Sequence, residues 1–292
     1  EVFFVADDGI HGDELWKTDG TLAGTVRLSD SFPGYDYGTP RFLTRVGARL
    51  FFCVSTPGLG EELWVSDGTV PGTTLVSDIN PGGNSSCGDH MADLDGVLFF
   101  AADDGVHGPE VWRSDGTAGG TFLVKDIYPG YPGAMAGGSA VVVDGTVYFP
   151  ATAPDVGQEL FKSDGTEAGT VMVKDINPGS ASSNSHSITE SGGTIFLVAS
   201  DGVTPYELFK TDGTEAGTVL VKDVNPGSSG SSPGFLTDLG GTLFFRAATA
   251  SGGTELWKSD GTEAGTVMVK DIWPGSGSSS PGYLTVSDGV LF

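Results

Sequence analysis

The chain has 292 residues, and 38% of them are hydrophobic, which is enough to build a substantial core. Its 38 Asp and Glu against 14 Lys and Arg give a formal net charge of −24, and a surface of that sign repels phosphate backbones and argues against a nucleic-acid partner. The 47 Gly and 16 Pro favour short strands over helices, and no apolar run approaches the roughly 18 residues of a membrane helix, so we expect no membrane insertion.

One phrase recurs six times from the N-terminus onward. Its copies read ELWKTDG, ELWVSDG, EVWRSDG, ELFKSDG, ELFKTDG and ELWKSDG, and they open at Glu14, Glu62, Glu110, Glu159, Glu207 and Glu255. A spacing of 48 or 49 residues is typical of repeat proteins, in which each copy buries its apolar face against its neighbours. We therefore expect the repeated residues to be scaffold and the loops that differ between copies to carry recognition.

Each copy predicts four strands, which the sixth copy shows most clearly. We call them strands A to D, and they span residues 233–241, 242–248, 254–259 and 266–272. A Gly-Gly pair ends strand A, and the turn DGTEAG separates strands C and D. Four antiparallel strands repeated six times predict an all-β fold, a six-bladed β-propeller over residues 1–292.

The two ends of the chain predict how the ring closes. The first copy lacks strand A, while residues 282–289 supply a strand A without a partner. Pairing the two would complete blade one and remove exposed sheet edges. Residues 2–3 and 291–292 then claim the same place, so one pair frays or the parent protein continues into further repeats; we expect a processed product or an excerpt of a longer chain.

The two cysteines leave one question open. Cys53 falls in a predicted strand and Cys87 in a Ser/Gly-rich loop. A disulfide is compatible with this placement, but the sequence does not give the Cα separation that a bridge requires.

Three repeated residue types are predicted to be structural. The Asp before Gly in the C–D turn should accept turn amide hydrogens, in preference to forming a ring of calcium sites. The aromatic residue of each phrase should pack between blades, in preference to stacking on sugars. The opening Glu should accept backbone hydrogens or pair with a Lys. The turn aspartates are Asp19, Asp67, Asp115, Asp164, Asp212 and Asp260, and the aromatic residues are Trp16, Trp64, Trp112, Phe161, Phe209 and Trp257.

The phrase resembles the ELWxxDGT repeat found in tandem in secreted and surface proteins of bacteria. The likeness covers essentially the whole chain, with Phe161 and Phe209 in place of Trp. It implies propeller-like modules at an extracellular or cell-surface location, without an established catalytic chemistry. The SDGTxxGT turn is also similar to the Asp-box of sialidase-like propellers, where such hairpins are structural, so it does not imply a glycosidase.

The B–C and D–A loops should emerge on one face of the propeller and the conserved-looking C–D turns on the other. Because variation marks the binding face of repeat proteins, we expect the ligand on the B–C and D–A side. Aromatic and His residues in these wet loops are the candidate ligand contacts. They are Tyr35, Tyr37, His90, Tyr128, Tyr131 and Trp273.

Two B–C loops also hold carboxylates near a His. Asp8 and Glu14 in the first copy, and Asp104 and Glu110 in the third, are candidate ligands for Ca²⁺. A solvated acidic hairpin is the alternative. The chain should require no cofactor, and bound calcium would raise its melting temperature by mass action.

These features predict a non-catalytic binding or structural module outside the cell. Its ligand would be a glycan, a neighbouring surface protein or another copy of the chain, and a multivalent lectin is one form of this. A carbohydrate-active hydrolase or lyase is the alternative, with carboxylates at the channel mouth. Candidate acids for it are Asp89, Asp93, Asp144 and Glu190.

Overall fold

The computed structural model describes residues 1–29, 38–130, 132–135 and 140–292. These residues form 25 strands and one short 3-10 helix, η1 (Ala118–Gly120). In the part of the chain that the structure describes, no helix is long and apolar enough to cross a membrane. The all-β prediction is confirmed.

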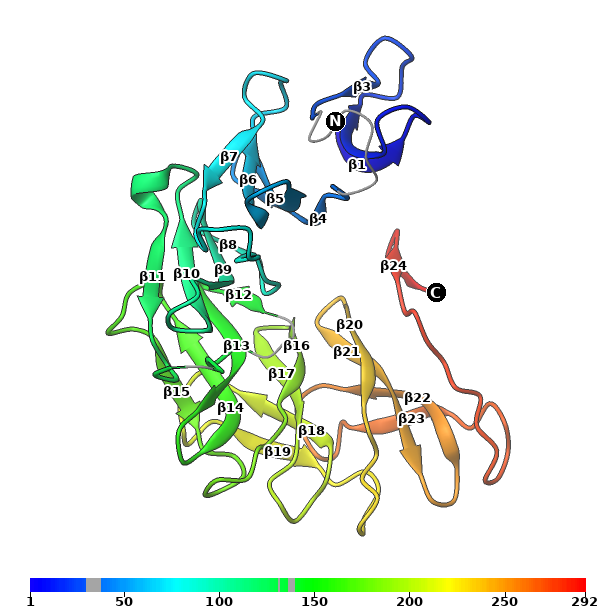
Figure 1. Ribbon diagram of the computed structural model, residues 1–292. Helices are drawn as coiled ribbons and strands as arrows, with labels where there is room; N and C mark the ends of the chain where they lie inside the picture. The colour runs from blue at the N-terminus through cyan, green and yellow to red at the C-terminus, as the bar shows by residue number, and fades with distance from the viewer. Residues whose placement is uncertain (30–37, 131, 136–139) are drawn as a thin grey trace. The chain divides into compact units, whose positions relative to one another are not determined.

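Six sheets follow one another along the chain, and in each the strands are neighbours in chain order (Figure 1). Sheet 1 contains β1 (Val2–Asp7), β2 (Asp13–Thr18) and β3 (Val26–Arg27). Sheet 2 contains β4 (Arg41–Val46), β5 (Arg49–Thr56), β6 (Gly60–Ser66) and β7 (Thr74–Ser77). Sheet 3 contains β8 (Ala92–Leu94), β9 (Val97–Asp103), β10 (Pro109–Ser114) and β11 (Phe122–Lys125).

The later sheets repeat this order. Sheet 4 contains β12 (Val141–Val143), β13 (Thr146–Ala153), β14 (Gly157–Ser163) and β15 (Val171–Lys174). Sheet 5 contains β16 (His186–Ser191), β17 (Thr194–Ala199), β18 (Glu207–Thr211) and β19 (Val219–Lys222). Sheet 6 contains β20 (Gly234–Leu239), β21 (Thr242–Thr249), β22 (Gly253–Ser259) and β23 (Val267–Lys270), and a last hairpin contains β24 (Val286–Ser287) and β25 (Val290–Leu291). The four predicted strands of the sixth copy are therefore present, with ends shifted by up to two residues.

The chain forms two compact units. The first consists of Glu1–Gly137, Asp144–Val147 and Asp164–Thr170, and the second of Gly138–Val143, Tyr148–Ser163 and Val171–Phe292. Sheets 1 to 3 belong to the first unit. Sheets 5 and 6, the last hairpin and most of sheet 4 belong to the second.

The C-terminal segment forms a hairpin of its own. Residues 282–289 were expected to pair with the first blade as its strand A, at a place that residues 2–3 and 291–292 both claim; in the structure Val286 and Ser287 pair with Leu291 and Val290. The turn between them, Asp288-Gly289, has φ values of 50° and 72°. Positive φ at both central residues is what a two-residue type I′ hairpin requires, so the local sequence closes this hairpin by itself.

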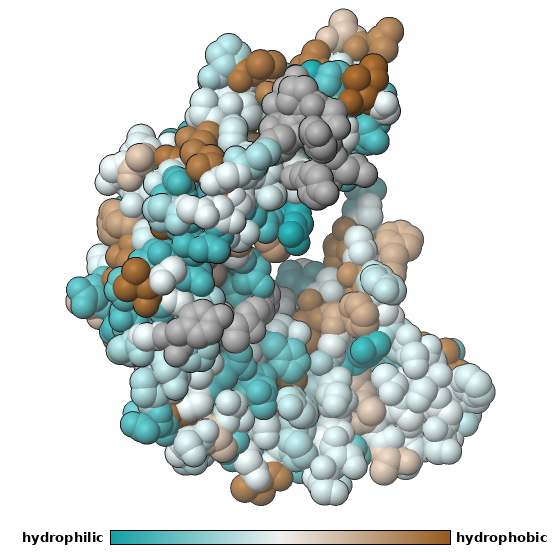
Figure 2. All heavy atoms as spheres, in the orientation of Figure 1, coloured by the Kyte–Doolittle hydropathy of each residue, from teal (hydrophilic) through white to brown (hydrophobic). Residues whose placement is uncertain are grey.

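Apolar side chains fill the space between successive sheets within each unit. In the first unit, Leu63 and Phe51 of sheet 2 and Phe100 of sheet 3 share a buried cluster against which Trp112 packs. In the second unit, Trp257 of sheet 6 lies in a cluster with residues of sheet 5. Trp64 and Phe209 occupy the same place in two further clusters, so the predicted role of the repeated aromatic residue is confirmed at these four positions. On the face drawn in Figure 2, hydrophobic residues lie in small groups among hydrophilic ones.

The C–D turns are built alike in all six copies. In the fifth, Asp212 Oδ1 accepts the Thr214 amide at 2.9 Å and the Thr214 hydroxyl at 2.7 Å. The same pair of bonds recurs at the other five turn aspartates. These bonds lower the pKa of Asp212, the hydroxyl contributing most. The turn-forming prediction for this Asp is confirmed.

Candidate functional site

A repeated bulge begins strand A. In sheets 2, 5 and 6 the register of strands A and B shifts at this point, so two residues of strand A oppose one of strand B. The first of these two residues has positive φ: Phe42 (56°), Ser187 (52°) and Phe235 (56°). His90 (60°) and Tyr283 (55°) have positive φ at the same position of the repeat. Positive φ is an outlier for bulky residues, and bulges often re-aim a side chain beside a functional site.

Sequence reasoning missed this position. Its signal is the residue pair just before the apolar start of strand A, which changes from copy to copy, while the next two residues are a Leu, Ile or Met and then a Thr or Ala. The described pairs are Arg41-Phe42, Asp89-His90, His186-Ser187, Gly234-Phe235 and Gly282-Tyr283.

The segment that leads from strand D into the bulge lies against the start of strand C. Backbone bonds join the two, such as Ser86 N–H to Glu61 O at 3.0 Å and Ser183 N–H to Gln158 O at 3.0 Å. The equivalent bond from Met135 N–H to Pro109 O measures 2.9 Å. The B–C and D–A loops therefore lie together at one end of sheets 2 to 6, as predicted.

The Glu that opens each phrase fixes this segment. Glu110 is fully buried and accepts the amides of Ile127 (2.9 Å), Tyr128 (2.9 Å) and Ala134 (3.0 Å). Burial raises the pKa of Glu110 to about 7, although these amides lower it in part. Glu159 accepts the amides of two equivalent positions, and its pKa is also raised to about 7 by burial. The prediction that this Glu accepts backbone hydrogens is confirmed.

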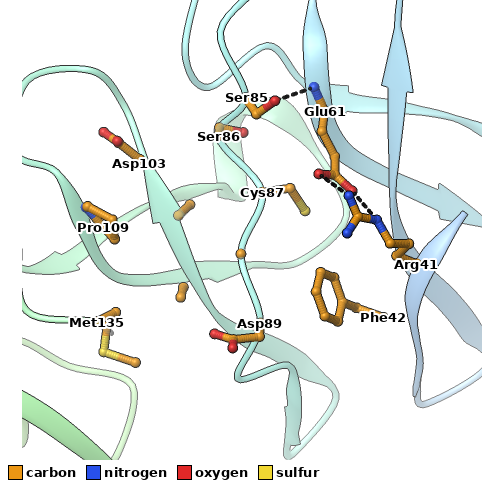
Figure 3. A pocket seen from close by; sticks show the side chains of 13 residues that line it. Arg41, Phe42, Glu61, Ser85, Ser86, Cys87, Asp89, Asp103, Pro109 and Met135 are labelled. Carbon is orange, nitrogen blue, oxygen red and sulfur yellow. Dashed lines mark hydrogen bonds and ion pairs between the residues drawn. The ribbon is translucent and has the colours of Figure 1, made fainter. Parts of the chain in front are cut away.

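A cavity of about 400 Å³ opens in the first unit, where the bulges of sheets 2 and 3 meet these loops. Figure 3 shows Arg41 and Phe42 on one side of it, Pro109 and Met135 on the other, and the segment from Ser85 to Asp89 between them.

Charged side chains line part of the wall. Arg41 binds Glu61 through two contacts, Nε to Oε1 at 3.1 Å and Nη2 to Oε2 at 3.3 Å. Asp89 and Asp103 add two more carboxylates. Asp103 Oδ1 accepts the amide of Gly105 at 2.8 Å. The wall therefore offers a forked donor and several acceptors close to one another.

Apolar groups form the rest of the wall. Phe42 is 41% exposed, and Ala101, Ala102, Pro109 and Met135 also line the cavity. A pocket that combines an exposed ring with convergent polar groups has the usual composition of a small-ligand site.

A disulfide joins Cys53 of β5 to Cys87 in the wall of the cavity, with a Cα–Cα distance of 6.0 Å. Cys87 also forms a β-bridge to Ala102 of sheet 3. The bridge that the sequence left open is therefore present, and it ties sheet 2 to the segment that leads into sheet 3.

Of the six predicted ligand residues, the structure describes three: His90, Tyr128 and Trp273. Tyr35, Tyr37 and Tyr131 lie outside the described residues. Tyr128 is half-buried, and Trp273 is 61% exposed in the second unit. These residues were selected from loop composition, which does not determine the direction in which a side chain points or how deeply it is buried.

His90 was expected on an exposed loop, but its side chain is buried, because the bulge turns it inward. Its Nδ1 lies 2.5 Å from Asp89 Oδ1. Burial lowers the pKa of His90, and the charge of Asp89 opposes that effect.

The candidate calcium ligands have local partners. Asp8 Oδ1 accepts the amides of Ile10 and His11, and Asp104 Oδ1 does the same for Val106 and His107. Glu14 and Glu110 are buried. Within the described ranges, no group of three or more His, Cys, Asp or Glu side chains is placed so that it could hold a metal ion.

Three of the four acids named for an enzyme lie at the A–B turns. Asp93 accepts the amides of Gly96 and Gly47, and Glu190 accepts that of Gly193. Asp144 is the left-handed residue of its turn, with φ of 48°. Asp89 alone of the four lines the described cavity.

Comparison with family models finds no match, and comparison with curated proteins finds none. Solved structures do match. A prolyl endopeptidase has 13% identity and a TM-score of 0.51, covering 91% of this chain and 39% of its own. Prolyl oligopeptidase B from Galerina marginata, bound to a 35-residue substrate, has 11% identity and a TM-score of 0.56, covering 91% and 41%. A puromycin hydrolase complexed with PGG has 15% identity and a TM-score of 0.52, covering 99% and 47%.

The chain thus spans less than half the length of each of these structures. At such identities the likeness concerns the fold alone. The matched regions are β-propeller domains, so the chain is an all-β protein built of repeated antiparallel sheets like those of a propeller.

Proposed function

We propose that the chain is a closed six-bladed β-propeller of the ELWxxDGT-repeat type and a non-catalytic binding module that holds a glycan in the Arg41–Glu61 cavity. In the closed ring, residues 282–289 form strand A of the first blade, and β1 takes the place of β25.

Two uncovered sheet faces support closure. Ile272, which follows strand D of sheet 6, is 53% exposed, whereas Ile79, Ile127 and Ile176 at the same repeat position are buried. Val2 of sheet 1 is also exposed, although its equivalents Leu50, Leu98 and Leu243 are buried. These are the two faces that meet at the junctions within each unit, so each is the natural partner of the other.

Basic side chains support the same junction. Within the second unit, strand C and D lysines reach the next sheet's C–D hairpin: Lys210 Nζ to Gly261 O and Lys222 Nζ to Thr266 O, both 2.8 Å. The equivalent side chains of sheet 6, Lys258 and Lys270, are exposed and make no hydrogen bond to any described residue. The repeat assigns them the carbonyls of Gly20 and Thr25.

The cavity carries the binding proposal. Its size lies in the range of small-ligand pockets, roughly 300–1,000 Å³. A sugar presents hydroxyl groups and a flat C–H face together. The carboxylates and Arg41 match the hydroxyls, and the exposed ring of Phe42 matches the C–H face.

The disulfide supports a location outside the cell. Such bonds persist in oxidising compartments and are rare in the cytosol. Together with the acidic surface, it favours the extracellular or cell-surface location that the repeat implies.

Glycan-array screening followed by calorimetry on the best neutral oligosaccharide tests the proposal. Phe42→Ala and Glu61→Gln should each weaken binding about tenfold, through loss of ring contact or of a charged hydrogen-bond partner. Phe122→Ala is the matched control, because Phe122 is similarly exposed on strand D and does not line the cavity. Binding that neither cavity variant changes, or binding of proteins alone, would overturn the glycan assignment.

A further inference from the structure

An aromatic cluster lies in the second unit, at the bulge of β20 and the segment before β24. The rings of Phe235 and Tyr283 have centroids 5.4 Å apart and planes tilted by 51°. The guanidinium of Arg246, on β21, lies 4.7 Å from the centroid of the Phe235 ring. Tyr283 is 87% exposed, so one ring of the cluster faces solvent fully.

The backbone is adapted to hold these three side chains. Phe235, in the bulge of β20, and Tyr283, at the same position of the repeat, both have positive φ, which costs on the order of 1–3 kcal/mol for such residues. The residue before each is Gly. A Cβ on Gly234 would meet Arg246 Nε at 3.2 Å, and one on Gly282 would meet the Phe235 ring at 3.3 Å. The two glycines thus leave the space that the ring and the guanidinium occupy.

Arg246 is the unusual member of the cluster. Within the part of the chain that the structure describes, its guanidinium has the Phe235 ring as a neighbour and forms no hydrogen bond or ion pair. Several other arginines bond to carbonyls or carboxylates, as Arg113 does to Gly165 O at 3.3 Å and Arg41 does to Glu61. A guanidinium stacked on a ring keeps its in-plane N–H groups available, and their fork matches a carboxylate.

An uncommitted cation in a chain of net charge −24 indicates an anionic ligand at this place. The adjoining rings of Phe235 and Tyr283 also favour a ligand that has a flat apolar face. A carboxylate attached directly to a sugar ring meets both requirements, since the ring C–H face stacks on Tyr283 while the carboxylate bonds to Arg246.

We propose that Arg246, Phe235 and Tyr283 form a binding site for a hexuronate unit of an acidic glycan. This site is independent of the Arg41–Glu61 cavity, which belongs to the other unit and offers mainly carboxylates. Its chemistry therefore extends the proposed function from neutral to acidic sugars.

Calorimetry of the intact chain with trigalacturonate tests the site. Arg246→Gln and Tyr283→Ala should each weaken binding about tenfold or more, and Arg246→Lys should weaken it less, since the charge remains while the fork is lost. Arg45→Gln is the matched control, because Arg45 is an exposed Arg on strand A of sheet 2. Phe42→Ala should also leave trigalacturonate binding unchanged, so failure of the cavity proposal and of this one can be told apart.

Three ligand controls decide the chemistry. The methyl ester of trigalacturonate should bind at least tenfold more weakly, and added salt should weaken the acid but not the ester. A triglutamate peptide should bind weakly and regardless of Tyr283→Ala. Equal binding of acid and ester, tight Tyr283-independent binding of the peptide, or no binding of trigalacturonate at millimolar concentration would overturn the proposal. Melting curves of all variants establish that they remain folded.

Discussion

At the scale of single residues, the third C–D turn contains a matched pair of glycines. A Cβ on Gly120 would come within 2.0 Å of Asp115 Oδ1, whereas one on Gly119 would meet nothing within 4 Å. Asp115 cannot move aside freely, because it holds both the amide and the hydroxyl of Thr117. Gly120→Ala should therefore cost about 1–3 kcal/mol of unfolding free energy.

Gly119→Ala is the control and should be neutral or stabilise by about 0.4–1 kcal/mol, through a less flexible unfolded chain. Urea unfolding of both variants measures the difference. Equal stability of the two would contradict the assigned role of the Asp carboxylate.

The buried glutamates make stability depend on pH. Burial raises the pKa of Glu110 in the folded chain to about 7, above its ordinary value of 4.5. The folded state then binds the proton more tightly, so this contribution is complete below about pH 4.5 and is lost as pH rises through about 7. It amounts to at most roughly 3 kcal/mol, and unfolding free energy should fall between pH 5 and pH 8.

Glu110→Gln should reduce that slope, and Glu159, whose pKa burial also raises to about 7, should maintain part of it. Glu255→Gln is the control at the same repeat position: burial raises the pKa of Glu255, but hydrogen bonds from Ser279 and from backbone amides outweigh it and lower the pKa overall. Its contribution is already complete above pH 4.5, so this variant should keep the slope of the parent chain. A parent chain more stable at pH 8 than at pH 5 would refute the assignment.

At the scale of elements, the sequence predicted the features that depend on residues close together along the chain. Strands A to D, the Asp-Gly turns and the interior place of Trp112 and Trp257 follow from alternation, turn chemistry and the repeat. The bulge does not follow from these patterns, because it depends on how strand A pairs with strand B. The left-handed residue at this position also changes between copies, for example from Phe42 to His90.

The candidate site depended on contacts that local patterns do not encode. Glu110 binds amides 17, 18 and 24 residues further along the chain. Arg41 lies on β4 and Glu61 on β6, so their ion pair spans the intervening strand β5. Loop composition therefore indicated the end of the sheets at which the cavity lies, while Tyr128, the one selected tyrosine that the structure describes, does not line the cavity.

At the scale of the whole molecule, the proposed closure of the ring would bury the outer faces of sheets 1 and 6, and without closure both faces would remain on the surface. If sheet 6 packs against sheet 1, Ile272 becomes buried like its equivalent Ile127. Ile272→Asp would then place a carboxylate in an apolar junction and should cost more than about 2 kcal/mol. Val267→Asp is the matched control, because the start of strand D is exposed in every sheet from 3 to 6, as Phe122, Val171 and Val219 show.

In a chain whose ends stay apart, both substitutions would lie on the surface and change stability by less than about 0.5 kcal/mol. Denaturant unfolding separates these cases, and small-angle scattering adds a second measure, with a radius of gyration near 19 Å expected for a closed domain of this length. Closure within one chain brings both faces together in the same molecule. A dimer or larger species that dissociates on Ile272→Asp would show that the two faces join different copies, because complementary but unequal surfaces associate head to tail.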